Sequence, residues 1–221
     1  MGKQRLSQRV LSLLLACVML LTCAPTAFAE STEAALMRLM KTEGTVSVTN
    51  SKGRSVTVRD DMRLNSGYGL ETEEASYAWI NLDDAKLVKM DAVSEISIRK
   101  SGKKLDILLD SGNLFFNVSK PLEEDETFNI RTSTMAVGIR GTCGWVKVID
   151  QWTSVLYVLE GTVTVTVTDP VTGETKTETV KGGETVTCKV YPQDTQGSKC
   201  DIILQTFTVS DIDGFVLVEL V

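Results

Sequence analysis

The strongest constraint in this sequence is the alternation of apolar and polar side chains along short segments. The period of two is clear at residues 46–48 and 78–82 and recurs as far as residues 186–190. Such a period places one set of side chains on a buried face and the other set outward, as in a β-strand. Turn-forming residues separate the segments, for example at 101–102 and 181–183. The pattern therefore predicts an all-β domain with about a dozen short strands.

Two architectures remain open for such strands. Short strands joined by tight turns can close as a sandwich or as the coils of a twisted, solenoid-like body. No tandem repeat of fixed length is visible, which disfavours a regular solenoid but not an irregular one. No segment after residue 41 keeps helical periodicity over the length of a normal helix. We therefore expect a solenoid-like or sandwich-like β domain.

The first 29 residues resemble an export signal. Lys3, Arg5 and Arg9 precede an uncharged run that ends in Ala27-Phe28-Ala29, the order found in secretory signal peptides. We expect a signal helix that is cleaved after Ala29; the alternative is an uncleaved anchor, which would be the chain's contact with the membrane. Both place the rest of the chain outside the cytoplasmic membrane, secreted or in the cell envelope. Cleavage removes three of the 23 basic residues and none of the 29 acidic ones, so the exported part is acidic.

The rest of the chain divides into three parts. Residues 30–41 are expected to form a short linker with a helical turn, because their apolar residues would share one side of a helix. Residues 42–190 hold the alternating segments of the β domain. Residues 191–221 form a C-terminal extension whose apolar end is expected to pair as a last strand on the domain. The alternative is a sticky end that binds a partner.

Three cysteines follow the export signal: Cys143, Cys188 and Cys200. Export permits disulfides, and a bond between Cys188 and Cys200 would tie the last alternating segment to the tail. Three reduced thiols are the open alternative, because no spacing rule fixes the pair.

The chain contains no histidine. This removes Ser-His-Asp and Cys-His catalysis and histidine-ligated zinc or haem, and three thiols are too few for a closed zinc site. The acidic run at residues 119–126 lacks the alternating oxygen ligands of a calcium loop, so we expect a solvated loop there. The net charge of −6 disfavours a nucleic-acid partner. No catalytic residue, metal or cofactor is therefore expected.

Three glycines at intervals of three residues, Gly138, Gly141 and Gly144, surround Arg140 and Thr142. A phosphate-binding loop lies between a strand and a helix, but here a strand-like segment follows. Glycines within a β pattern mark a bulge, a corner or a close backbone approach, so we expect a tight crossing of the chain. We also expect Arg140 to be partly enclosed, with its donors on backbone carbonyls or a carboxylate, so a structural clamp is the first interpretation and a ligand contact the second.

These residues carry a family resemblance. Residues 132–142 read Thr-Ser-Thr-Met-Ala-Val-Gly-Ile-Arg-Gly-Thr, which is similar to the T-P-x-A-x-x-G-V-R-G-T motif of the FecR domain family, with serine in place of proline. Residues 158–163 resemble the family's V-x-E-G-x-V, and residues 180–184 its closing glycine turn. The resemblance covers residues 42–190. Its structural motif residues are Gly138, Arg140, Gly141, Thr142, Gly161, Gly182 and Gly183.

The resemblance implies an exported, all-β, non-catalytic bacterial domain that contacts an envelope or surface protein, or a cell-wall polymer. Family members of the iron-transport type are single-pass regulators whose outer domain senses a transporter and whose cytoplasmic tail controls a sigma factor. Only nine residues precede the apolar run here, fewer than such a tail needs. We therefore expect a binding and scaffolding module, with signalling as a further role.

Hypotheses from two other classes stay open. A carbohydrate-binding or adhesion domain would show an exposed row of aromatic side chains. The candidates for that row are Tyr68, Tyr77, Trp79, Trp145 and Trp152. A carboxylate-dependent glycosidase would need two acids that face each other across a cleft.

Overall fold

The computed structural model describes residues 37–170, 172–194 and 197–219, and for residues 192–199 it describes only the backbone. The expected signal peptide and its helix, and residues 30–36 of the expected linker, lie outside these residues. Within the described ranges, no helix is long and apolar enough to cross a membrane.

The described residues form two nine-stranded sheets, and the expected all-β fold is confirmed. Sheet A has the order β18-β17-β14-β13-β10-β7-β6-β1-β4, and sheet B the order β16-β15-β12-β11-β9-β8-β5-β2-β3. The strands of sheet A are β1 (Arg38–Glu43), β4 (Met62–Arg63), β6 (Tyr77–Asn81), β7 (Lys86–Met90), β10 (Asn113–Val118), β13 (Cys143–Asp150), β14 (Thr153–Glu160), β17 (Glu184–Asp194) and β18 (Gly197–Thr206). The strands of sheet B are β2 (Val46–Thr49), β3 (Ser55–Val56), β5 (Gly69–Thr72), β8 (Glu95–Ser101), β9 (Lys104–Ser111), β11 (Thr127–Arg131), β12 (Ala136–Ile139), β15 (Thr162–Thr168) and β16 (Thr175–Lys181).

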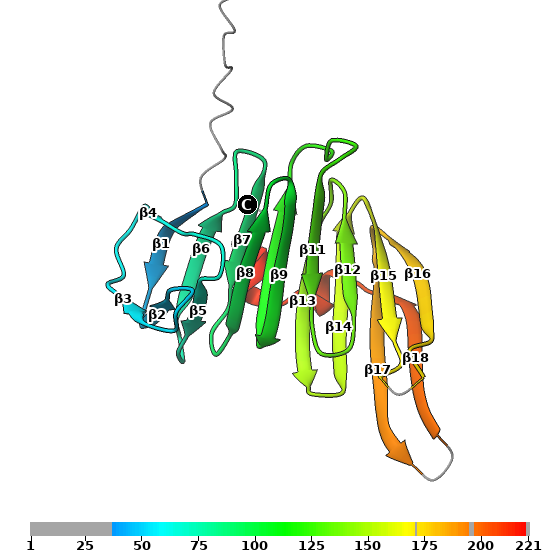
Figure 1. Cartoon of the computed structure of the whole chain (residues 1–221). Coiled ribbons are helices and arrows are strands. Elements are labelled where there is room, and N and C mark those ends of the chain that lie inside the picture. Colours follow the sequence, from blue (N-terminus) through cyan, green and yellow to red (C-terminus); the bar gives the residue numbers. More distant parts are fainter. Residues whose placement is uncertain (1–36, 171, 195–196, 220–221) are drawn as a thin grey trace, which may run out of the picture. The chain divides into compact units, whose positions relative to one another are not determined.

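The chain passes back and forth between the sheets, usually after a hairpin of two strands (Figure 1). Apart from β3 and β4, which lie outside β2 and β1, both sheets therefore follow the order of the sequence toward the β16 and β18 end. β10 is a single strand in sheet A, so the strands on either side of it in sequence, β9 and β11, pair in parallel in sheet B. The progression is that of an irregular solenoid and the packing is that of a sandwich, so both expected descriptions apply.

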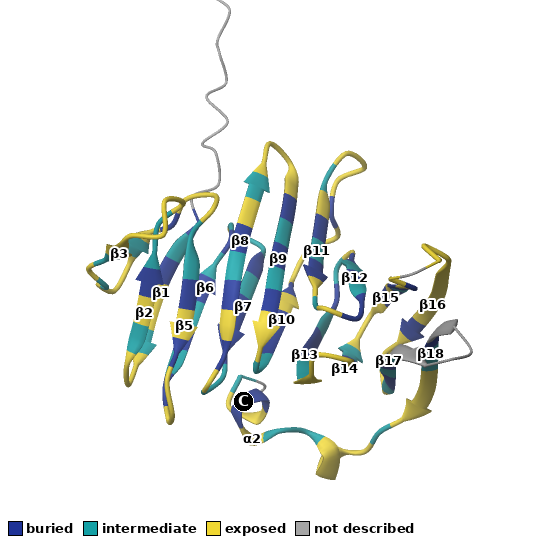
Figure 2. Cartoon of the chain, turned by 60° about the horizontal axis from the view of Figure 1, so that its bottom comes forward, coloured by how far each residue is buried: buried dark blue, intermediate teal, exposed yellow. Residues whose placement is uncertain are grey.

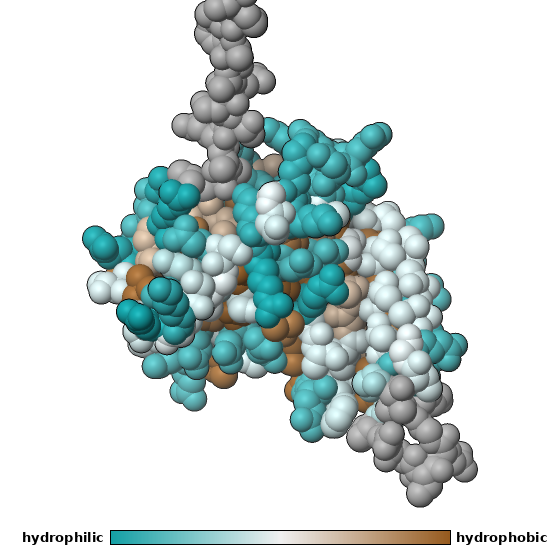
Figure 3. Space-filling model, in the orientation of Figure 1, coloured by the Kyte–Doolittle hydropathy of each residue, from teal (hydrophilic) through white to brown (hydrophobic). Residues whose placement is uncertain are grey.

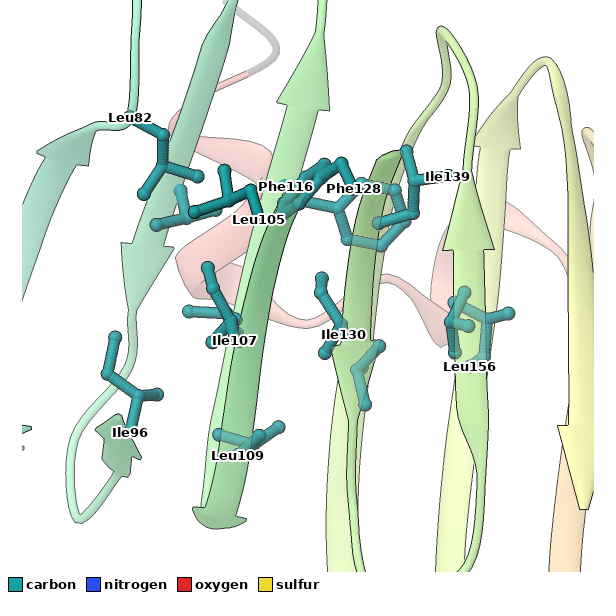
Figure 4. Packing of buried hydrophobic residues seen from close by; sticks show 14 of the residues in the cluster. Leu82, Ile96, Leu105, Ile107, Leu109, Phe116, Phe128, Ile130, Ile139 and Leu156 are labelled. Atoms are coloured by element: carbon teal, nitrogen blue, oxygen red, sulfur yellow. The ribbon is translucent and has the colours of Figure 1, made fainter. Parts of the chain in front are cut away.

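The inner core lies between the two sheets and is built from alternate positions of their strands. Figure 4 shows Ile107 of β9, Ile130 of β11 and Leu156 of β14 among the buried side chains of this core. All three side chains are fully buried. Burying an aliphatic side chain of this size contributes roughly 1.5–3 kcal/mol, so the alternating pattern supplies most of the force that holds the sheets together.

The structure corrects the expectations about the start of the domain. The described part of the expected helical turn is strand β1, which pairs with β6 and places Leu39 opposite Ile80. Both side chains are fully buried, because the sheet offers Leu39 a better apolar environment than an isolated helical turn would. The described strands number eighteen rather than about a dozen, partly because β3 and β4 are only two residues long.

The C-terminal extension is partly strand and partly helix. Strand β17 continues past Val190 to Asp194, and β18 pairs with it over Gly197–Thr206. The chain then forms a 3-10 turn, η1 (Val209–Asp211), and one short helix, α2 (Gly214–Leu217). Figure 2 shows α2 beside the sheets, connected to β18 by this turn. We call residues 207–219 the C-terminal segment.

Candidate functional site

The motif identified in the sequence lies where the chain crosses from sheet B to sheet A. Gly138 is a regular position of β12, between Asn129 of β11 and Thr164 of β15. A Cβ at Gly138 would lie 3.7 Å from the nearest atoms of both residues, an ordinary contact distance. Gly138 therefore does not belong to the close approach that the sequence predicts.

The close approach begins at Gly141, which has a φ of +94°. A Cβ there would lie 3.2 Å from the Pro121 Cα, so the crossing packs against the loop that follows β10. At Gly161, with a φ of +87°, a Cβ would lie 2.5 Å from the Thr142 Cγ2. At Gly144 it would lie 2.3 Å from the Tyr157 carbonyl oxygen. A side chain at any of these positions would displace its neighbours.

The closing glycine turn joins the same region. The Gly182 amide donates to the Gly161 carbonyl at 3.0 Å, and the Gly183 amide donates to the Val158 carbonyl at 2.8 Å. The structure thus brings together Gly141, Thr142, Gly161, Gly182 and Gly183 from three loops. Spacing along the sequence cannot show this clustering, but glycines that recur at turns of the family motif are the signal for it.

Arg140 departs from the expected structural role. It lies in the bend between β12 and β13 and is exposed. Among the described residues, its guanidinium has no hydrogen-bond or ion-pair partner, so it is not a clamp on nearby carbonyls. The expectation was wrong because the apolar residues before Arg140 belong to β12, whereas Arg140 itself lies beyond the end of that strand.

A shallow pocket of about 150 Å³ lies beside the crossing. Its lining residues are Asn117, Val118, Ser119, Lys120, Pro121, Gly141, Thr142, Cys143 and Glu160. Burial, followed by the charge of Glu160, raises the pKa of the Cys143 thiol to about 11. A thiol with that pKa is protonated near neutral pH and is a poor nucleophile. The pocket therefore does not present a reactive cysteine.

A second apolar region, the outer cluster, lies on the face of sheet A opposite to the inner core. Its buried members are Phe115, Trp145, Phe215 and Val216, and Tyr157 and Phe207 pack against them. The Trp145 and Tyr157 rings stack at 4.3 Å between centroids, with an interplanar angle of 2°. Phe207 meets both rings edge-on. The C-terminal segment thus covers an aromatic surface of sheet A.

A buried lysine fastens this segment to the sheet. Lys89 of β7 is only 3% exposed; its Nζ donates to the Phe215 carbonyl at 2.8 Å and lies 3.0 Å from the Glu219 carboxylate. Glu219 also accepts a hydrogen bond from the Trp79 Nε1 at 2.9 Å. Lys89 occupies an outward position of an alternating strand, where the sequence predicts contact with solvent. The rings of Tyr77 and Trp79 on the neighbouring strand lie 5.4 and 4.8 Å from the Lys89 Nζ, but its hydrogen-bond and ion-pair partners come from the tail, which is distant in sequence.

The five candidate aromatic residues do not form the exposed row that a carbohydrate-binding or adhesion domain would show. Trp145 is fully buried in the outer cluster, and Tyr77 packs against the same cluster. Trp79 is half-buried and bonded to Glu219, whereas Tyr68 packs against the inner core. Trp152, 38% exposed, lies at the turn between β13 and β14.

The acidic loop at 119–126 binds lysines of the same chain. Lys103 donates to Glu123 at 2.6 Å and to Asp125 at 2.9 Å, and these hydrogen bonds raise the pKa of Lys103. Lys86 contacts both Asp83 and Glu126. Figure 3 shows a hydrophilic surface over the loop that leads into β11. No group of three potential metal ligands occurs among the described residues.

Cys188 and Cys200 are free thiols in the structure. In the register of β17 and β18, Cys188 lies opposite Ile202 and Cys200 opposite Val190, so the two cysteines are diagonal neighbours. Diagonal side chains in a sheet are about 7–8 Å apart, whereas a disulfide needs Cβ atoms about 4 Å apart. The expected disulfide is therefore not formed here. Burial, followed by the neighbouring Cys200, raises the pKa of Cys188 to about 12.

Comparison with known proteins finds one family match and two similar crystal structures. Residues 69–164 match the family described as FecR protein, a shorter range than the resemblance in the sequence suggested. No curated protein matches. Two crystal structures of a putative anti-sigma factor from Parabacteroides distasonis are similar, each with 18% identity and a TM-score of 0.49. Each match covers 62% of this chain and 59% of that chain.

Proposed function

The chain belongs to the FecR family through residues 69–164, and we propose that it is an exported, non-catalytic module that binds a protein of the cell envelope or cell surface in a regulatory role. The family match supports a regulatory role related to signalling. The signal-like N-terminus supports export. Two observations support a non-catalytic role: the sequence has no histidine, and the thiol at the pocket, Cys143, has a raised pKa.

The exposed Arg140 is the observation that carries the proposal. The glycines around the crossing have a structural role, because a side chain at Gly161 would clash with Thr142 and one at Gly141 would be strained by the φ of +94°. Arg140 has none, since its guanidinium has no partner within the described part of the chain. Arginine is enriched at the energetic centres of protein interfaces, and its planar donors pair with carboxylates. We therefore place the contact surface at Arg140 and the adjoining pocket.

The test compares Arg140→Glu with Arg99→Glu, a matched change at an exposed arginine of β8. Each purified chain is immobilised and exposed to solubilised envelope proteins and, separately, to isolated cell wall. We expect a discrete protein that binds the wild type and the Arg99 variant but not the Arg140 variant, and that binds again when purified. Equal thermal unfolding of the two variants shows that both fold.

Two outcomes contradict the proposal. Binding that survives Arg140→Glu would remove the proposed contact surface. Retention of cell-wall polymer, with no protein partner, would favour the carbohydrate-binding alternative, for which Trp152 is the exposed aromatic candidate.

A further inference from the structure

The strands at the ends of the two sheets differ in their protection against further pairing. At one end, β3 and β4 are each two residues long. At the other end, β16 closes sheet B with seven residues and β18 closes sheet A with ten. A long unpaired edge can pair with another chain, and proteins protect such edges with short strands, prolines or inward-pointing charges.

β16 has this protection. Lys176 and Glu178 lie opposite Val167 and Val165, two buried residues of β15. Paired residues of neighbouring strands share a face, so both charges lie on the inward side of β16. Burying them against a new partner would cost free energy, which opposes pairing at this edge.

β18 lacks this protection. Its inward positions are occupied by Cys200, Ile202 and Leu204. From Cys200 to Thr206 the strand has no proline, and Asp201 is its one charged residue. Ile203 and Leu204 are 42% and 44% exposed. The strand is therefore long, apolar and uncovered at its outer side.

Hydrogen bonds at both sides of β17 show which backbone groups of β18 face outward. The Val190 amide donates to the Trp152 carbonyl at 2.9 Å. The backbone groups of Val190 therefore point toward the β14 side of β17 and away from β18. The Phe207 amide donates to the Gly183 carbonyl at 3.2 Å, so the backbone groups of Phe207, just after β18, point toward β17. In an antiparallel pair, successive residues direct their backbone groups to opposite sides. The even-numbered residues of 200–206 therefore point theirs outward.

These outward groups are almost all available. The Lys176 Nζ donates to the Cys200 carbonyl at 2.6 Å. No other described residue bonds to this edge, so the backbone groups of Ile202 and Leu204 are open to a partner strand. Figure 1 shows β18 as the last strand of sheet A.

We propose that β18 pairs antiparallel with the β18 of a second copy of this chain, with Ile203 opposite Ile203 on the two-fold axis. This register places Ile202 opposite Leu204, so the outward backbone groups of both strands meet. It also places Asp201 opposite Gln205, without a clash of like charges. A register centred on Asp201 would oppose two carboxylates, and one centred on Ile202 would oppose Asp201 and Ile203. A register centred on Leu204 would oppose Ile203 and Gln205. The register centred on Ile203 is preferred because it pairs apolar side chains with apolar ones and polar side chains with polar ones, so the edge is complementary to itself, as a two-fold interface requires.

Charge substitution at the axis tests the proposal by analytical ultracentrifugation. The wild-type chain is expected to sediment as a dimer whose fraction rises with concentration. Ile203→Lys and Ile203→Glu are each expected to be monomeric, because like charges then face each other. An equal mixture of the two variants is expected to regain the dimer, which excludes misfolding as the cause of its loss. A monomeric wild type, dimers in both single variants, or a mixture that stays monomeric would each overturn the proposal.

Cross-linking tests the register. Directly opposed residues of a non-hydrogen-bonded pair have Cα atoms about 4.5 Å apart, within the range of a disulfide. Ile203→Cys should therefore form a covalent dimer with oxidised glutathione, well above the wild-type level. The matched control is Gln205→Cys, on the same face of β18 but opposite Asp201 of the second copy, and it should not exceed the wild type. Equal cross-linking of both variants, or of neither, would overturn the register.

Discussion

The two apolar regions of this domain use opposite faces of the same strands. The inner core takes alternate side chains from both sheets, whereas the outer cluster takes the other face of sheet A and is covered by the C-terminal segment. β10, β13 and β14 show the overlap, because each has three consecutive buried residues. A strand in a two-layer sandwich needs one buried face, and these strands have two.

The difference lies in what covers each region. The inner core is covered by a second nine-stranded sheet, whose hydrogen bonds hold it in place. The outer cluster is covered by a 3-10 turn and a four-residue helix, which are too short to be stable without tertiary contacts. The outer cover therefore depends on Trp145, Lys89 and the rings around them, and it should open more readily than the sheets.

The largest expected effect comes from Trp145→Ala. The ring is fully buried, so its removal should lower the free energy of unfolding by about 3–5 kcal/mol, measured by chemical denaturation. The matched control, Trp152→Ala at an exposed turn, should change it by less than about 0.5 kcal/mol. Similar losses in the two variants would mean that the outer cluster contributes little to stability.

Lys89→Ala tests the polar attachment of the cover. It leaves the partly enclosed Glu219 carboxylate without its cation and should cost about 2–3 kcal/mol. Lys41→Ala is the control: Lys41 also lies over the Trp79 ring but is exposed, and its loss should cost less than about 1 kcal/mol. Equal losses of unfolding free energy in the two variants would mean that the contacts of Lys89 with the C-terminal segment add nothing to stability.

Gly144→Ala tests the close approach between Gly144 of β13 and the backbone of β14, two strands that contribute to both apolar regions. Its Cβ would lie 2.3 Å from the Tyr157 carbonyl, so we expect a loss of about 2 kcal/mol in the free energy of unfolding. Gly138→Ala, with contacts at 3.7 Å, should change stability by less than about 1 kcal/mol. Both changes are measured by chemical denaturation. A larger loss for Gly138→Ala than for Gly144→Ala would place the close approach at Gly138.

The last effect is absent at neutral pH and concerns the titration of Cys188 in the inner core. Because the pKa of Cys188 is raised to about 12 from an ordinary 9.0, the folded chain holds this proton more tightly than the unfolded chain. Its contribution to stability is complete below pH 9 and is lost as the pH rises from 9 toward 12, by up to about 1.4 kcal/mol per pH unit. The Cys188→Ala variant should therefore show a shallower fall of unfolding free energy above pH 9. Parallel curves would contradict this assignment.

The inner core could be predicted from the sequence and the outer cluster could not. Alternation identifies the inward residues, such as Ile96 and Ile98 of β8, because each strand contributes its own period. Trp145 next to Val146 breaks the period, which signals a strand buried on both faces but does not say what covers the second face. The cover comes from Phe215 and Glu219, seventy or more residues along the chain. Likewise, Arg140 lies one residue beyond the end of β12, and no periodicity fixes a strand end that closely.

The most direct test of the two-region account is the exposure of Trp145 with and without the C-terminal segment. In a chain with Trp79→Phe and Trp152→Phe, Trp145 is the remaining tryptophan. We predict blue-shifted emission and weak acrylamide quenching in the full chain. When the chain ends at Thr206, we predict a red shift and strong quenching, while far-ultraviolet circular dichroism retains the signal of the sheets. Emission and quenching that do not change after the truncation would contradict the claim that this segment covers sheet A.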